Sequence, residues 1–414
     1  MEERVILAID LKSFYASVEC KRRNLDPFST PLVVADLFRG DGTIVLAASP
    51  SIKERYGVKS RCRLSEVDRN IPGLIVARPH MQSYLEESAK VNSVYLDYVG
   101  EEDLHVYSID ESFLDVTHYL KRGKDSPESY ARKILSDIQR RLGLVATCGI
   151  GPNLFLAKCA MDQEAKKRKD RLAHWRKEDV PEKLWNVFPL SKLWGIGPRM
   201  ERRLLSHGFA TMGDIAVSQE SYLQKLFGVI GRDLYQHAWG EDDAQIQEKY
   251  RSKRETIGVG EALLRDYDSS ELPTLVHDLV LELAENLARK ERLAGRILLQ
   301  ALTKDGEAFQ LLLEMEEKTD SSFALWEKIK DNLPKEEGRK YRRIHLVALS
   351  LFSRKEVQRT LFYDEEKDRR EKRLEETTRK IRKEYGTNKA MPCSALLPSS
   401  TYWMRSQQIG GHHR

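Results

Sequence analysis

The sequence predicts an α+β fold, with a mixed sheet first, a helical region next and a second, smaller α+β unit after it. Up to about residue 170, short apolar runs alternate irregularly with helical patterns. That irregular order favours a sheet with helices on one face over a doubly wound parallel sheet. From there to about residue 247 the strand patterns stop, and glycines punctuate helical segments.

Composition restricts the classes of protein to which the chain can belong. Its 414 residues are enough for about two to four domains. The five cysteines are scattered and never spaced as C-x-x-C, which argues against a disulfide framework and a zinc site and fits a reducing cytosol. No apolar run approaches the ~20 residues of a bilayer span, and the first residues lack a signal-peptide pattern. We therefore expect a soluble, cytoplasmic protein without a membrane partner.

Apolar runs and helical spacing locate the elements of the first part. The expected strands are residues 5–9, 31–35, 43–48, 74–78 and 145–151. The expected helices are residues 12–21, 51–56, 81–99, 129–142 and 153–169. The first strand is apolar throughout, which is typical of a strand covered on both faces.

Acidic residues end or interrupt these strands at two places. Asp10 directly follows the first strand, where it is either a metal ligand or the N-cap of the next helix. Asp110 and Glu111 lie between two short apolar segments. In a plain hairpin their carboxylates face water, whereas burial requires a cation or a hydrogen-bond network to neutralise them. Because consecutive strand residues point to opposite faces, both acids reach one site only if Glu111 lies at a strand end or a turn.

A glycine turn marks the helical region. Residues 193–200 read LWGIGPRM, and a Gly-apolar-Gly turn between short helices presents backbone N–H groups to a phosphate. Such turns are common, but the arginines at 199, 202 and 203 follow at once and favour a helix-hairpin-helix. The basic run at residues 166–169 is typical of a solvated face, and it also suits contacts to duplex phosphates.

The remainder contains a linker, a second α+β unit and a tail. Residues 248–254 are polar and charged and are expected to be the linker. Strand, helix, strand, helix and strand patterns then follow at residues 256–262, 272–291, 296–303 with 309–313, 321–333 and 344–351. Residues 367–383 are predicted to form a charged helix, and residues 392–414 are expected to be loosely ordered.

Three segments resemble motifs of the Y-family, the UmuC/DinB group of translesion DNA polymerases. They are AIDLKSFYASVE at residues 8–19, YSIDESFLD at residues 107–115 and GIGPNLFLAK at residues 149–158. Each motif alone is weak, but the three occur in the family's order with appropriate spacing. The resemblance covers about residues 4 to 353.

The resemblance implies a right-hand polymerase with four parts and a tail. The expected ranges are an α/β palm at 1–13 and 78–169, small fingers at 14–77, a helical thumb with the helix-hairpin-helix at 170–247, an α+β little finger at 255–353 and a C-terminal tail at 354–414.

By motif match, Asp10, Asp110 and Glu111 are the catalytic acids and bind two Mg²⁺ ions. The backbone carbonyl of Leu11 is a further implied ligand, and Mn²⁺ is an alternative cation. Mg²⁺ prefers oxygen ligands, and two metals can clamp the attacking and leaving oxygens in phosphoryl transfer.

The same match implies contacts to the nucleotide. Tyr15 matches the steric gate, whose ring blocks a ribose 2′-hydroxyl, and Phe14 precedes it beneath the sugar. Lys158 meets the triphosphate as a mobile point charge. Ordinary core packing is the alternative role for Tyr15, and a solvated helix lysine is the alternative for Lys158.

The fingers depart from the family pattern. Many members place a Tyr and an Arg three residues apart to grip the triphosphate, whereas this chain has Ser51 and Glu54 there. By its position in this alignment, Ser51 is an expected nucleotide-binding residue. Glu54 cannot bind phosphate as an arginine does, so Lys53 or Arg55 is expected to substitute.

The resemblance also implies partners. The DNA contacts expected in the thumb are Gly195, Ile196, Gly197 and Arg199. The clamp-binding residues are Gln358, Leu361 and Phe362, which match the Gln-x-x-Leu-Phe peptide by which such polymerases dock on a sliding clamp. Accessory subunits are a further partner class, since some UmuC-type enzymes require them.

We therefore predict a template-directed, low-fidelity DNA polymerase that performs translesion synthesis on primer-template DNA with dNTPs, in DNA repair, damage tolerance and the SOS response. One alternative is a non-catalytic DNA- and clamp-binding factor that keeps the fold, against which the retained acids and Lys158 argue. Another is a different two-metal phosphoryl transferase, such as a nuclease or cyclase, for which the sequence has no motif.

Overall fold

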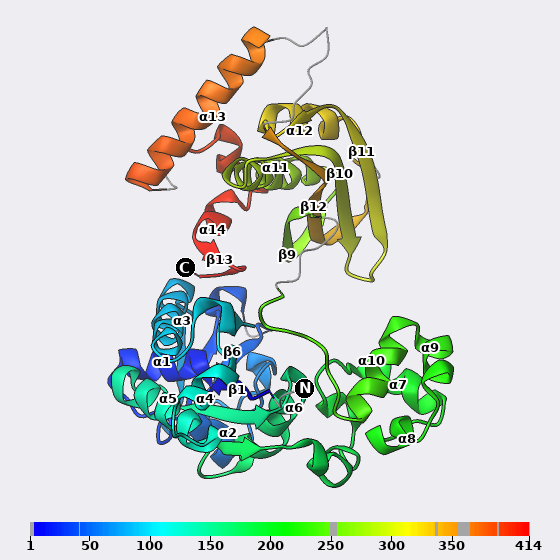
Figure 1. Ribbon diagram of the computed structural model, residues 1–414. Helices are drawn as coiled ribbons and strands as arrows, with labels where there is room; N and C mark the ends of the chain where they lie inside the picture. Colours follow the sequence, from blue (N-terminus) through cyan, green and yellow to red (C-terminus); the bar gives the residue numbers. More distant parts are fainter. Residues whose placement is uncertain are drawn as a thin grey trace. The chain divides into compact units, whose positions relative to one another are not determined.

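The computed structural model describes residues 4–40, 42–248, 255–335, 338–354, 365–386 and 389–413. The chain divides into two compact units, Met1–Tyr250 and Arg251–Arg414 (Figure 1). The division falls inside the stretch that composition predicts as a linker. Within the described ranges, none of the helices combines the length and the apolar character that a membrane span requires.

A five-stranded sheet forms the centre of the first unit. Its order is β5-β6-β1-β7-β8, and β1 pairs antiparallel with both β6 and β7. The strands are β1 (Ile6–Leu11), β5 (Leu104–Val106), β6 (Glu111–Asp115), β7 (Ala146–Gly151) and β8 (Leu172–His174). The expectation that strands stop at residue 170 is wrong, because β8 pairs parallel with β7.

Helices cover both faces of this sheet, so the expectation of helices on one face is also wrong. Along β1, Leu7 and Ile9 pack in one core with α3 (Met81–Leu96) and α5 (Pro127–Leu142). Ile6 and Ala8 pack in another core with α6 (Leu154–Cys159). Alternate side chains of a strand point to opposite faces, which explains why the whole run is apolar.

Two glycines let α6 lie directly on β7. A Cβ atom added to Gly149 would lie 2.1 Å from the carbonyl oxygen of Ala157. One added to Gly151 would lie 2.5 Å from the Ala157 nitrogen. The predicted helix over residues 153–169 is not continuous: α6 is followed by the π-helical turn η4 (Ala160–Glu164) and a 3₁₀ turn, η5 (Ala165–Lys167).

A three-stranded sheet, in the order β3-β2-β4, has a core of its own. Its strands are β2 (Leu32–Ala35), β3 (Val45–Ala48) and β4 (Ile75–Ala77). The helix α2 (Pro50–Tyr56) contributes Ile52 to that core. Ser49 caps the start of α2, and Gly57, with φ at 67°, ends it in the left-handed conformation that glycine favours.

Four helices form the last part of the first unit. They are α7 (Pro198–Ser206), α8 (Met212–Ala216), α9 (Glu220–Phe227) and α10 (Val229–Ala238). Two hydrogen bonds join the segment after α10 to the start of α6: Asn153 Nδ2 donates to the Gly240 carbonyl at 2.8 Å, and Phe155 N donates to Asp242 Oδ2 at 3.1 Å. The other helices described in this unit are α1 (Phe14–Arg22), α4 (Thr117–Arg122), η1 (Leu37–Arg39), η2 (Leu64–Glu66), η3 (Glu101–Asp103), η6 (Lys177–Asp179), η7 (Val180–Leu184) and η8 (Leu190–Lys192).

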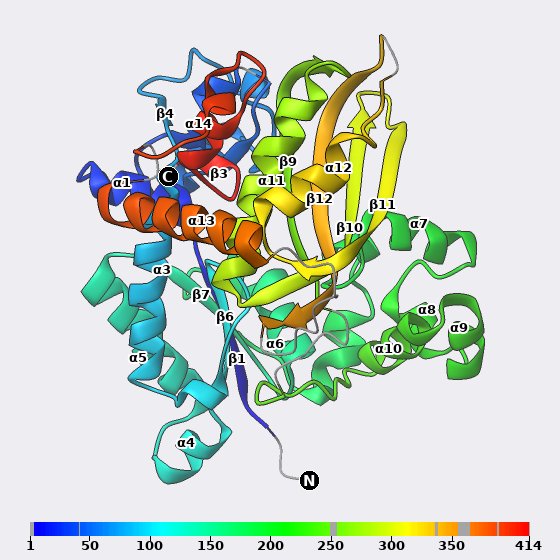
Figure 2. The ribbon, with the colours of Figure 1, turned by 90° about the horizontal axis from the view of Figure 1, so that it is seen from above.

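The second unit contains a four-stranded antiparallel sheet in the order β11-β10-β12-β9. Its strands are β9 (Ile257–Asp268), β10 (Arg292–Thr303), β11 (Ala308–Thr319) and β12 (Lys340–Ser353). Along β9, buried and exposed residues alternate over the first eight positions, which is the pattern of a sheet with one covered face. The covering helices are α11 (Leu272–Arg289) and α12 (Ser322–Lys330) (Figure 2).

The end of the chain is ordered against this second unit, so the expectation of a loosely ordered segment at 392–414 is wrong for its described residues. The elements are η10 (Cys393–Leu396), α14 (Tyr402–Ser406), β13 (Gln408–Ile409) and β14 (His412–His413). The carboxylate oxygen Oδ2 of Asp278, in α11, accepts hydrogen bonds from Ser400 Oγ at 2.8 Å, Thr401 N at 2.8 Å and Tyr402 N at 3.0 Å. Arg405 pairs with Glu261 of β9 at 3.1 Å.

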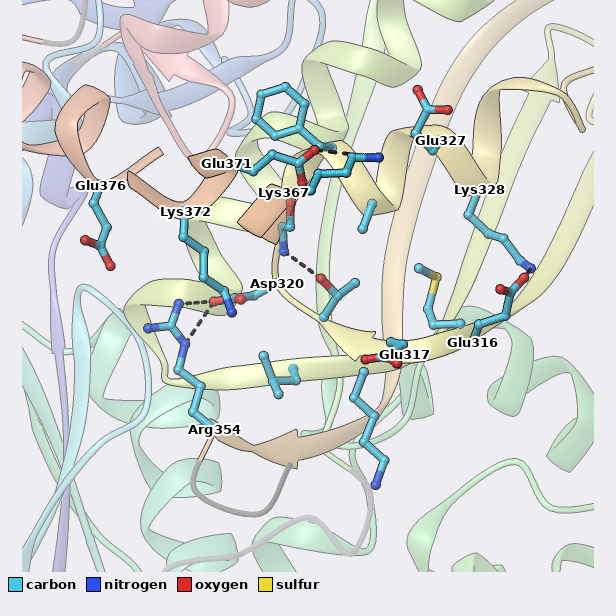
Figure 3. A pocket seen from close by; sticks show the side chains of 17 residues that line it. Glu316, Glu317, Asp320, Glu327, Lys328, Arg354, Lys367, Glu371, Lys372 and Glu376 are labelled. Carbon is cyan, nitrogen blue, oxygen red and sulfur yellow. Dashed lines mark hydrogen bonds and ion pairs between the residues drawn. The ribbon is translucent and has the colours of Figure 1, made fainter. Parts of the chain in front are cut away.

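The charged helix α13 (Glu365–Tyr385) also contacts this unit. Its Glu375 accepts hydrogen bonds from both the backbone N and the Oγ of Ser322, each at 2.7 Å, at the start of α12. A cavity of about 620 Å³ lies between α12, α13 and β11 (Figure 3). Charged residues of both signs line it, and Lys328 pairs with Glu316 there at 2.8 Å.

Candidate active site

Asp10 and Glu111 lie directly opposite each other on the paired strands β1 and β6. Opposed residues of an antiparallel pair project to the same face. Glu111 is the first residue of β6, and Asp110 lies in the bend just before it, where its carbonyl accepts the Leu11 N–H at 2.9 Å. This is the strand-end position that lets both acids reach one site. The N-cap of α1 is Ser13, so Asp10 does not cap that helix.

Two lysines approach these acids from the segment after β7. The Lys158 ammonium lies 2.7 Å from Glu111 Oε2, and the Lys166 ammonium lies 3.3 Å from Asp10 Oδ2. Asp162 joins the two lysines, at 3.1 Å from Lys158 and 2.8 Å from Lys166. Lys166 belongs to the basic run for which a solvated face or contacts to duplex phosphates are expected, whereas in the structure it pairs with Asp10 and Asp162.

Burial dominates the electrostatics of this cluster. It raises the pKa of Asp10 from 3.8 to about 6; Lys166 opposes the rise, and the neighbouring acids Asp110 and Glu111 add to it. Burial likewise raises the pKa of Glu111, against the hydrogen bond from Lys158. Both carboxylates therefore lose solvation that a cation can replace.

The acids have the chemistry of a divalent-cation site. Glu111 is 7% exposed, and its Oε1 is buried without a hydrogen-bond partner, which leaves an oxygen available to a ligand. Carboxylate oxygens are the donors that Mg²⁺ prefers. Among the described residues, no group of three or more His, Cys, Asp or Glu side chains is already gathered around one point where a metal could be held. Lys158 pairs with Glu111, and Lys166 pairs with Asp10.

Phe14 and Tyr15 begin α1, three residues beyond the end of β1. Phe14 is 2% exposed, whereas Tyr15 is half-buried. The Tyr15 ring stacks on Tyr84 of α3 with centroids 4.4 Å apart and planes 15° apart. Burial raises the pKa of Tyr15, and Asp110 adds to that rise, which places the ring in the electrostatic field of the acids.

The three-stranded sheet region presents Lys53 rather than Ser51 to this site. Ser51 is 1% exposed, and its hydroxyl is buried without a partner. Lys53 donates to Ser13 Oγ at 2.9 Å. Burial lowers the pKa of Lys53, and Asp10 opposes that shift, so the ammonium lies within the field of Asp10. Glu54 is exposed and pairs with Lys12 at 3.3 Å.

The glycine turn has the form of a helix-hairpin-helix. Gly195 has φ at 86°, a conformation open to glycine, and Gly197 is the N-cap of α7. Ile196 is 5% exposed and anchors the turn in the helical core, while Arg199 is exposed. The predicted clamp-binding residues Gln358, Leu361 and Phe362 lie outside the described residues.

Comparison with known proteins agrees with this arrangement. Residues 9–162 match the impB/mucB/samB family, and residues 177–209 match the IMS family HHH motif. UvrX of Bacillus subtilis (strain 168) is 41% identical over 292 residues, which cover 70% of this chain and 68% of UvrX. DNA polymerase IV 2 of the same organism is 31% identical over 423 residues, which cover 100% of both chains.

The chain belongs to the Y-family of DNA polymerases. The predicted family and the predicted activity, DNA-directed DNA polymerase, are thereby confirmed. Among solved structures, the Y-family DNA polymerase chimera Dbh-Dpo4(243-245)-Dbh matches with a TM-score of 0.69 and 20% identity, covering 84% of this chain and 99% of the chimera. That likeness confirms the predicted right-hand α+β fold.

Sequence reasoning missed several residues of this Y-family site. Lys166 and Asp162 could have been found from their spacing, since residues 158, 162 and 166 are each four apart after the third motif. The contact of Tyr84 with Tyr15, outside the acid cluster, carries no sequence signal, because it depends on how α3 packs against α1.

Proposed function

We propose that this Y-family polymerase performs low-fidelity translesion synthesis by joining a dNTP to the primer 3′-hydroxyl at Asp10, Asp110 and Glu111. The observation that carries the proposal is that Asp10 and Glu111 lie opposite each other on paired strands. One carboxylate oxygen of Glu111 is buried there without a hydrogen-bond partner. Relatives whose names indicate repair include the DNA repair protein homolog YobH of Bacillus subtilis (strain 168), 42% identical over 167 residues.

Asp10, Asp110 and Glu111 would hold two Mg²⁺ ions, with the Leu11 carbonyl as a further ligand. When bound, such ions neutralise charge on the attacking and leaving oxygens of nucleotidyl transfer. Lys158 and Lys166 pair with two of these carboxylates, Glu111 and Asp10. If Mg²⁺ took over those carboxylates, the two ammonium groups would be released to pair with the triphosphate of an incoming nucleotide, a role suited to a mobile point charge.

Three side chains define the rest of the nucleotide site in this proposal. Tyr15 excludes the ribose 2′-hydroxyl, Phe14 supports the sugar, and Lys53 takes the place of the missing fingers arginine. Lys53 is preferred over Arg55 because it contacts Ser13 at 2.9 Å and lies in the field of Asp10, whereas Arg55 is exposed. Ser51 is unsuited to a direct triphosphate contact, because it is 1% exposed.

The structural parts take the roles of a right-hand polymerase. We assign the palm to the five-stranded sheet with its helices and extend it through β8, the fingers to the three-stranded sheet, the thumb to α7 through α10 and the little finger to the four-stranded sheet. Primer-template DNA is the expected partner of the thumb turn at Gly195, Gly197 and Arg199. A fingers region built on three short strands offers little surface to check a base pair, which supports low fidelity.

Primer extension tests the proposal. Wild-type protein with Mg²⁺, dNTPs and labelled primer-template should extend the primer on both undamaged and lesion-containing templates. Asp110→Asn should abolish extension while DNA binding persists. Full extension by Asp110→Asn, or no extension by the wild type, would refute the mechanism.

A further inference from the structure

Three aromatic rings form a cluster at the start of α1. Tyr15 stacks on Tyr84 at 4.4 Å, and Phe14 meets the same Tyr84 ring edge-on at 6.4 Å. Tyr15 is half-buried, so one of its faces is covered by Tyr84 while part of the ring is open to solvent. A stacked neighbour restricts the rotamers that such a half-exposed ring can adopt.

Tyr84 is itself held rigidly. It is fully buried, and its hydroxyl donates to Oε1 of Glu19 at 2.8 Å. Glu19 lies in α1, so this bond ties α3 to the helix that carries Tyr15. The anchoring hydroxyl and the stacking face therefore belong to one ring, which contacts α1 at two points.

Glu19 is a well-supported acceptor. It is 0% exposed, and it also contacts Arg23, Arg22 at 3.4 Å and His80 Nδ1 at 2.9 Å. Burial by itself raises the pKa of Glu19, but the hydrogen bonds from Arg23, Tyr84 and His80 hold it below its ordinary value. The acceptor is thus ionised, and a charged acceptor strengthens the bond from the Tyr84 hydroxyl.

We propose that Tyr84 is a positioning residue for sugar selection, and that its ring holds Tyr15 in the orientation that excludes ribonucleotides. The inference rests on the proposed function, since it takes Tyr15 as the residue that meets the sugar. Tyr84 touches neither the acids nor the lysines of the cluster in any contact described above, so its loss should change selectivity rather than the chemical step.

Single-nucleotide incorporation tests this with the full chain. Tyr84→Leu and Tyr84→Met remove the ring and keep most of the buried volume, while Tyr84→Phe keeps the ring and loses only the hydroxyl. The ratio of kcat/KM for a dNTP to that for the matching rNTP is measured for each. We expect the two ring-removing variants to lower this ratio about two- to tenfold, the range to which the coupling of an aromatic pair corresponds.

The change should come from a lower KM for the rNTP, with kcat for the dNTP unchanged. Tyr84→Phe should restore most of the wild-type ratio. The double variant Tyr15→Ala, Tyr84→Leu should have the same dNTP-to-rNTP ratio as Tyr15→Ala alone, because the Tyr15 ring that Tyr84 positions is absent from both. Thermal unfolding of each variant shows whether it is folded. If either Tyr84→Leu or Tyr84→Met does not fold, the other still tests the inference.

The outcomes distinguish a failure of the role proposed for Tyr15 from a failure of the role proposed for Tyr84. If Tyr15→Ala does not relax ribonucleotide exclusion, the proposed role of Tyr15 fails. If Tyr15→Ala relaxes it while folded Tyr84→Leu or Tyr84→Met keeps the wild-type ratio, Tyr84 is not a positioning residue. Equal losses of kcat for both sugars in the Tyr84 variants would also overturn the inference, because they indicate a merely structural role.

Discussion

The ammonium of Lys166 lies 3.3 Å from the carboxylate of Asp10, at the place where the acids of β1 and β6 come together. Asp162 accepts the same ammonium at 2.8 Å, so Lys166 bridges an acid of the sheet and an acid of the π-helical turn η4. A cation bound through Asp10 would therefore compete with Lys166 for that carboxylate.

Replacing Lys166 should therefore strengthen cation binding. Lys166→Ala removes the competitor of Asp10, and an ion pair with this exposure is worth up to about 1 kcal/mol, so Mn²⁺ should bind about two- to fivefold more tightly. Electron paramagnetic resonance of free Mn²⁺ measures this without turnover. Lys167→Ala, at the exposed neighbouring position, is the matched control and should bind as the wild type does. Weaker binding by Lys166→Ala would contradict the displacement argument.

Asp10 should destabilise the metal-free protein at neutral pH. Its pKa rises from 3.8 to about 6 in the folded state, so folding favours the protonated acid. Stability from this group is therefore present below pH ~4 and is lost as the pH rises through ~6. In EDTA at pH 7.5, Asp10→Asn should be more stable by about 1–3 kcal/mol, with the gain vanishing near pH 4.

Urea unfolding at the two pH values measures that difference. Glu178→Gln, at an exposed position, provides the control and should show no such pH-dependent gain. A gain for Asp10→Asn of the same size at both pH values would mean that proton binding is not its cause.

Lys53 should matter for nucleotide affinity. Lys53→Ala removes a partly buried ammonium from the field of Asp10, and a hydrogen bond to a charged phosphate is worth about 1.5 kcal/mol or more, so KM for the dNTP should rise about tenfold. Steady-state incorporation kinetics on undamaged template give the value. Arg55→Ala removes an exposed cation two residues away and should change KM little. Equal effects from both variants would indicate nonspecific loss of charge.

Arg405 should stabilise the second unit. Its partner Glu261 has a side chain only 6% exposed, and removal of one member of a buried pair leaves the other uncompensated. Arg405→Ala should lower the free energy of unfolding of this unit by about 2–4 kcal/mol. Hydrogen exchange of α11 and β9 in the full chain localises the effect. Arg373→Ala, at an exposed position of α13, is the control and should leave hydrogen exchange unchanged. If α11 and β9 of Arg405→Ala exchange as slowly as in the wild type, the Arg405–Glu261 pair contributes little to stability.

Strong local patterns made much of the architecture predictable from sequence. The apolar run of β1 and the amphipathic spacing of α5 depend on neighbours along the chain, so their elements were found. The strand β8 has three residues in a charged segment, and only its pairing with β7 makes it a strand. The order of residues 392–413 likewise depends on the buried acceptor Asp278, more than a hundred residues earlier.

Some residues of the candidate site are likewise predictable from local sequence, whereas others depend on tertiary packing. Asp10, Asp110 and Glu111 lie in motifs whose residue types state their chemistry, whereas Lys166 looks like any lysine in a basic run. Its position near Asp10 follows from the π-helical turn, whose residues have no unusual composition. The prediction for Ser51 rests on alignment alone, and the burial of its side chain depends on packing in the three-stranded sheet.

The hydrogen bonds between Asp278 and residues 400–402 have a consequence for synthesis on the ribosome. Domains generally fold as units in the order of their synthesis, but only when all of their segments have emerged. Near the end of the first unit, Gln247 donates a hydrogen bond to Asp103 at 2.7 Å, so the contacts of this unit are complete before the second unit is made and it can fold early. The second unit leaves two buried acids, Asp278 and Glu261, without these partners until Arg405 is available. In a nascent chain, the first unit would therefore be folded while the sheet of the second unit still lacks these contacts and remains accessible to chaperones.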